Sequence, residues 1–76
     1  MNTPKYNPLD IVEYIIFIIN KFATTFGLSE IQAYRYMKNF EAIEFVKENY
    51  GIMHTLDDRS SVESVANFCK RKGGLL

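Results

Sequence analysis

The stretch of sequence that decides the fold is IVEYIIFIINKFATTF, residues 11–26. Apolar side chains recur in it at intervals of three and four, which places them on one face of a helix. Asp10 precedes the stretch as a predicted N-cap, and Gly27 follows it as a residue that readily adopts the left-handed conformation of a helix end. We predict a helix over residues 10–26. The side chains predicted to form the centre of the core are Ile15, Ile18, Ile19 and Phe22.

Working outward, residues 1–9 contain two prolines and no periodic pattern, so we predict an extended N-terminal arm. Beyond Gly27, Ser29 and Gln32 have the spacing of a capping box, in which each side chain bonds a backbone N–H of the other residue. This predicts a second helix over residues 30–39. After a break near Phe40, a third helix is predicted over residues 41–49, closed by Gly51.

Residues 52–58 show no helical period and are predicted to form an extended or turn segment, with Ile52 and Met53 at the edge of the core. Ser60 and Glu63 have the spacing of a second capping box, which predicts a last helix over residues 61–72. The sequence therefore predicts an all-α fold, a compact bundle of about four short helices that forms a single domain over residues 1–76.

Length and composition limit what this chain can be. Its 76 residues, 47% of them hydrophobic, suffice for one small core, which is weakly stable without a disulfide or a metal. Nine basic and nine acidic residues cancel, so no net charge attracts the chain to nucleic acid or to a membrane. The longest apolar run, residues 14–19, is far shorter than the ~20 residues of a transmembrane helix. The single cysteine and the lack of a signal peptide pattern predict a cytoplasmic location.

Two groups of residues could in principle support chemistry. A nucleophilic site would need the Cys69 thiolate beside a base such as His54, but Cys69 lies on the apolar face of the last predicted helix. His54, Asp57 and Asp58 match no usual spacing of metal ligands, and the two aspartates are common turn and capping residues. We expect no catalytic residue, metal, cofactor or small-molecule substrate, and hence a protein that is not an enzyme.

The aromatic residues favour a protein partner or a homo-oligomer. Aromatic side chains make up 14% of the chain, which is generous for this size. Phe17 falls outside the core face of the first helix at 100° per residue, among polar neighbours. A lone exposed apolar side chain is common, but a small core without staples also favours association. The residues predicted to contact a partner are Phe17, Tyr36 and Tyr50.

A second class of function is a DNA-binding regulator with a helix-turn-helix arrangement. The helix over residues 30–39 follows a glycine-containing turn and carries Arg35 and Lys38, as a recognition helix would. Its basic residues are few and the next helix is acidic, which opposes binding to phosphates, so nucleic acid is the less favoured partner. Duplex binding would weaken steeply with salt, whereas a contact between protein helices would not.

The segment Tyr50-Gly51-Ile52-Met53-His54-Thr55 resembles the Tyr-x-x-Leu-His-Thr signature of a bacterial family known as domain of unknown function 3791. An apolar first helix, Gly27-Leu28-Ser29, Phe40 and the closing helix follow in the family's order, so the resemblance covers residues 15–73. It departs from the pattern at Met53, where the family has leucine, and at Leu56, where a polar residue is frequent.

The resemblance implies no established activity. Genes of the family often stand beside genes for proteins that look like ADP-ribosyltransferases, which implies an antitoxin-like role for the small partner. From the residues themselves we predict that His54 is structural: its ring bonds a backbone group across the turn, and Thr55 supports the loop.

Overall fold

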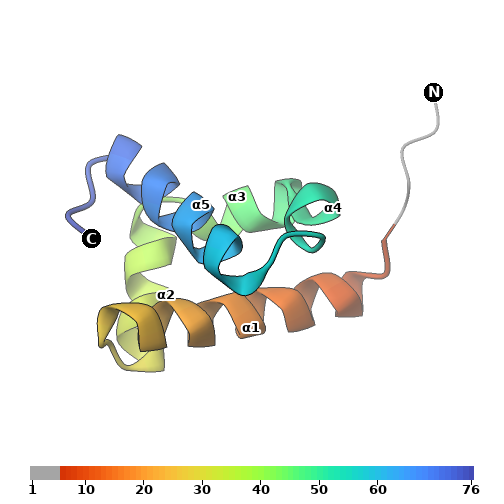
Figure 1. Ribbon diagram of the computed structural model, residues 1–76, viewed down its shortest axis with the longest axis horizontal. Coiled ribbons are helices and arrows are strands. Elements are labelled where there is room, and N and C mark those ends of the chain that lie inside the picture. Colours follow the sequence, from red (N-terminus) through yellow and green to blue (C-terminus); the bar gives the residue numbers. More distant parts are fainter. Residues whose placement is uncertain (1–5) are drawn as a thin grey trace.

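The computed structural model describes residues 6–76, and every regular element in that range is a helix (Figure 1). The elements are α1 (Pro8–Phe26), α2 (Glu30–Asn39), α3 (Ala42–Glu48), α4 (Tyr50–Met53) and α5 (Asp58–Arg71). The predicted all-α bundle is confirmed, with one more short helix than the sequence indicated. Residues 1–5 of the predicted extended arm lie outside the described residues.

Helix α1 begins earlier than predicted. Its N-cap is Asn7, whose side-chain oxygen accepts a hydrogen bond from the Leu9 N–H at 2.9 Å. Pro8 occupies the first helical position, where its missing N–H costs nothing, and Asp10 lies in the first turn instead of capping it. The last residues of the predicted arm are therefore helical. At the other end Gly27 has the expected left-handed conformation, with φ 67°.

The predicted capping box starts α2. Ser29 Oγ accepts from the Gln32 N–H at 3.1 Å, and Gln32 Oε1 accepts from the Ser29 N–H at 2.9 Å. The short turn between the helices bends the chain by 106°, so α2 crosses the end of α1 (Figure 1).

The segment over residues 52–58, predicted to be extended or a turn, is non-helical only over residues 54–57; Ile52 and Met53 at its start and Asp58 at its end are helical. The N–H groups of Ile52 and Met53 bond back to the Asn49 carbonyl, which forms the helical turn α4. Gly51 lies inside this turn and does not close α3, which ends at Glu48. Helix α5 begins at Asp58 with Asp57 as its N-cap, so Ser60 is helical and the Ser60–Glu63 pattern is not a capping box.

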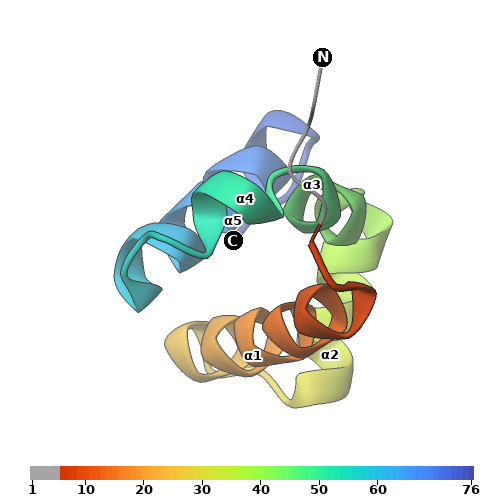
Figure 2. The same ribbon diagram turned by 90° about the vertical axis from the view of Figure 1, so that its right-hand side faces the viewer.

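The core lies between α1 on one side and α3 with α5 on the other (Figure 2). Ile18 and Phe22 are fully buried, as predicted, whereas Ile15 and Ile19 are partly buried at its edge. Side chains from other helices that are also fully buried are Ala33, Met37, Ala42, Val46, Val65 and Cys69.

Within residues 6–76 no single helix is both long and apolar enough to cross a membrane. Only α1 and α2 taken together meet those two conditions, and they are bent by 106° at their junction.

Candidate protein-interaction groove

A surface groove of about 570 Å³ lies between α1 and α5. Phe26 from α1 and Val62 and Ala66 from α5 give it an apolar floor. Figure 2 shows the two helices that carry these residues, with α1 below and α5 above. The remaining residues that line the groove are Lys21, Thr25, Asp58, Arg59, Glu63, Asn67 and Lys70. We call this feature the α1–α5 groove.

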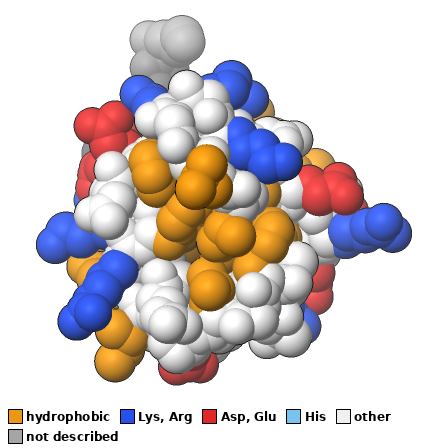
Figure 3. Space-filling view, turned by 90° about the vertical axis from the view of Figure 1, so that its left-hand side faces the viewer, with side chains coloured by type: hydrophobic (Ala, Val, Ile, Leu, Met, Phe, Trp, Pro, Cys, Tyr) orange, Lys and Arg blue, Asp and Glu red, His pale blue; other side chains and the backbone are white. Residues whose placement is uncertain are grey.

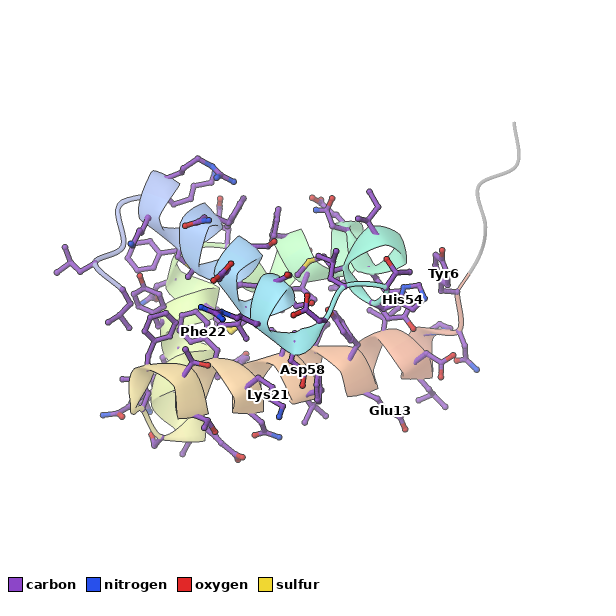
Figure 4. All side chains as sticks on the ribbon, viewed as in Figure 1. Tyr6, Glu13, Lys21, Phe22, His54 and Asp58 are labelled. Atoms are coloured by element: carbon purple, nitrogen blue, oxygen red, sulfur yellow. The ribbon has the colours of Figure 1, made fainter. Side chains whose placement is uncertain are left out.

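Charged side chains form the rim of the α1–α5 groove. Lys21 Nζ and Asp58 Oδ2 approach to 3.6 Å from the two helices, and both side chains are labelled in Figure 4. Arg59 Nε lies 3.5 Å from Glu63 Oε2, one turn along α5. Because all four side chains are largely exposed, each pair is worth at most about 1 kcal/mol. These pairs shape the rim more than they stabilise the fold.

The α5 edge of the groove follows helical spacing. Arg59, Glu63, Asn67 and Lys70 recur at intervals of four, four and three, so they lie along one side of the helix. At 1.5 Å per residue this edge is roughly 17 Å long, about three helical turns. The groove is therefore long enough to take a short helix of another chain.

Phe17 lies on α1 one turn before Lys21, so it continues the α1 edge of the groove towards the N-terminus. Its side chain is 37% exposed, as expected for a position outside the core face. The ring centroid is 5.6 Å from Lys21 Nζ and 6.2 Å from the Tyr14 ring. Of the three aromatic residues predicted to meet a partner, Phe17 is the one beside the groove.

Tyr36 and Tyr50 are engaged within the fold. Tyr36 stacks on Phe22 at 5.7 Å between ring centroids, and its hydroxyl oxygen accepts from the Leu76 N–H at 3.0 Å. Tyr50 is only 9% exposed and makes an edge contact with Tyr14 at 5.4 Å. Both rings therefore contribute to packing, and neither lines the groove.

His54 and Thr55 cap the turn after α4. The His54 Nδ1 atom lies 2.7 Å from the Tyr50 carbonyl oxygen, and the ring must donate because a carbonyl can only accept. Its ring stacks on Tyr50 at 4.5 Å, and the Thr55 hydroxyl donates to the Ile52 carbonyl at 2.6 Å. The predicted backbone bond of His54 is present, although the residue is exposed and not buried as the prediction assumed. Figure 4 shows His54 close to Tyr6, at the opposite end of the molecule from the C-terminus.

We expect His54→Ala to lower the free energy of unfolding by about 1 kcal/mol, because an exposed hydrogen bond and one aromatic stack are lost. His54→Phe should recover part of the loss, since it keeps the stack and lacks the bond. Thermal unfolding of the three proteins measures both effects. Unchanged unfolding of His54→Ala together with lost partner binding would instead make His54 a direct contact.

The Cys69 thiol is fully buried in the second half of α5, and burial raises its pKa to about 11. At neutral pH it is protonated and behaves as a small apolar side chain. His54 lies beyond α4 at the other end of the molecule (Figures 1 and 4), so the structure does not bring these two residues together. In the described part of the chain, no group of three or more His, Cys, Asp and Glu side chains could hold a metal ion.

Thr25, Asn67 and Lys70 were not singled out from the sequence. The polar edge of α5 was visible in the spacing of Arg59, Glu63, Asn67 and Lys70, but such an edge normally faces solvent. Only the position of α1 beside it makes this edge one side of a groove.

Fold and groove together define the class of this protein as a small all-α bundle with an open, apolar-floored groove between its first and last helices. The chain belongs to the family described as protein of unknown function, DUF3791, whose model matches residues 13–72. Searches of curated proteins and of solved structures found no match.

Proposed function

We propose that this protein is a non-enzymatic protein-interaction module that binds another protein in the α1–α5 groove. The observation that carries the proposal is the apolar floor of the groove within a charged rim. An apolar centre with a polar border is the usual anatomy of a protein interface. Phe17 extends the apolar surface beyond the end of the groove. The alternative occupant of the groove is a second copy of this chain, which would make a homo-oligomer.

More specifically, we propose that the chain is the small antitoxin-like partner of an ADP-ribosyltransferase-like protein in the cytoplasm. This form rests on the family resemblance and its implied gene neighbours, and not on the geometry of the groove. Co-expression with the product of the adjacent gene, followed by purification through a tag on that product, tests it.

We expect Thr25→Arg to weaken the complex with this product at least about tenfold, because a long charged side chain would enter the groove from the α1 edge. Thr24→Arg is the matched control. Thr24 is the preceding exposed residue of α1 and does not line the groove. Titration calorimetry of both variants measures the difference. Equal affinity of the two variants would show that the partner binds elsewhere.

A helix-turn-helix DNA-binding regulator is the second candidate, favoured by one observation. The 106° bend between α1 and α2 lies within the 90–120° range that is typical of such helix pairs. Arg35 and Lys38 are exposed on α2, although Ile31 is 63% exposed on the same helix. Duplex binding that falls steeply with salt and is lost in the Arg35→Ala and Lys38→Ala variants would favour this candidate over the groove.

A further inference from the structure

The two ends of the α1–α5 groove differ in charge. At one end Lys21 and Asp58 neutralise each other at 3.6 Å, and Arg59 is next to Glu63. At the other end Lys70 makes no ion pair within the described residues 6–76. The ammonium group of Lys70 is therefore uncompensated, and it lies at the end of the groove that contains Phe26, the largest apolar side chain of the floor.

Among the described residues that line the groove, Lys70 is the basic side chain at this end. Arg71 and Lys72 follow it in the chain but lie over the Phe68 ring, which does not line the groove. Lys72 Nζ is also 3.2 Å from Glu41 Oε1. Figure 3 shows an apolar patch on this end of the molecule, with both basic and acidic side chains around it. Partly buried apolar residues of the elements that form this end are Phe26, Leu28, Tyr36 and Leu76. A ligand that enters the groove from this end meets apolar surface with the Lys70 ammonium group on the α5 side.

We infer that the α1–α5 groove holds an amphipathic helix of about three turns from another protein, and that this helix carries a carboxylate where it meets Lys70. The inference rests on the proposed function and specifies the partner's chemistry. Helices that bind in grooves place apolar anchors at intervals of three and four residues, and the groove edge from Arg59 to Lys70 matches that length. The carboxylate fixes which way round the helix lies, since the paired charges at the Lys21 end offer it no equivalent partner.

The test is selection from a displayed library of 15-residue helical peptides against the full chain and against Lys70→Glu. Peptides selected on the parent are expected to share apolar residues at helical spacing and an Asp or Glu near one end. In nuclear magnetic resonance spectra, such a peptide should shift the amides of Thr25, Ala66 and Asn67. Its affinity should fall about three- to tenfold for Lys70→Glu, and replacing the acidic residue of the peptide with lysine should restore binding to that variant.

Lys38→Glu is the control, since it makes the same charge change on α2, outside the groove lining. It should leave the affinity of the selected peptide unchanged. Peptides that shift the groove amides but bind Lys70→Glu as tightly as the parent would overturn the charge assignment and leave the proposed function standing. Selected peptides that shift other surfaces, or none that bind at all, would overturn the inference. Equal affinity of the partner for Thr25→Arg and Thr24→Arg would separately overturn the proposed function.

Discussion

Phe22→Ala is expected to lower the free energy of unfolding by about 3 to 5 kcal/mol, which is a large part of the stability of a domain of this size. Phe22 is fully buried, and its ring contacts Phe26 and Tyr36 at 4.6 and 5.7 Å between centroids. Removing the ring leaves a cavity between α1 and α2 and also takes away the surface on which Tyr36 stacks. Ile18→Ala, one turn earlier and equally buried, should cost about 2 to 5 kcal/mol.

Urea or thermal unfolding measures the effect, and Phe17→Ala is the matched control. Phe17 is the same residue type on the same helix, but it is 37% exposed and outside the core, so its removal should cost no more than about 1 kcal/mol. Equal destabilisation by the two variants would mean that the outer edge of α1 is packed as tightly as its inner face, which contradicts the fold.

Met37→Ala is expected to lower the free energy of unfolding by about 2 to 5 kcal/mol, because Met37 is fully buried and fills the core where α2 crosses α1. Ala23 and Ala33 are buried in the same core, and their small side chains let helices pack closely but cannot expand to fill the cavity. The loss in the free energy of unfolding should therefore lie in the upper part of this range.

Ile31→Ala is the control for α2, because Ile31 is apolar, lies on the same helix and is 63% exposed. It should change stability by no more than about 0.5 kcal/mol in the same unfolding experiment. A Met37→Ala variant that unfolds at the parent's temperature would show that α2 does not belong to the core. In that case the 106° arrangement of α1 and α2 would need another source of stability.

Local signals in the sequence were sufficient for α1 and α2. Gly27 closes α1, and the Ser29–Gln32 pair begins α2, because each depends on the conformation or hydrogen bonds of residues within three positions. The helical turn α4 was not predicted, because four residues are too few to show a helical period. The start of α5 was predicted too late, because the Ser60–Glu63 spacing was taken for the cap and the N-cap is Asp57.

Tyr14 illustrates contacts that no local pattern contains. Its hydroxyl lies 3.0 Å from both the Met53 carbonyl oxygen and the Ser61 hydroxyl, and burial raises its pKa while the Ser61 bond opposes the rise. These partners are 39 and 47 residues away in the chain. From the sequence, Tyr14 was one more apolar residue of a long run.

The sequence by itself determined the all-α class, the central place of Ile18 and Phe22, the limits of α2 and the backbone bond of His54, because periodicity and caps act over a few residues. Tertiary structure alone decided that Tyr36 and Tyr50 are used in packing, and that Thr25 of α1 faces Asn67 and Lys70 of α5 across a groove. Such a groove depends on how two helices more than thirty residues apart are packed against each other. Helical periodicity specifies which face of each helix is buried, but not which helix lies beside it.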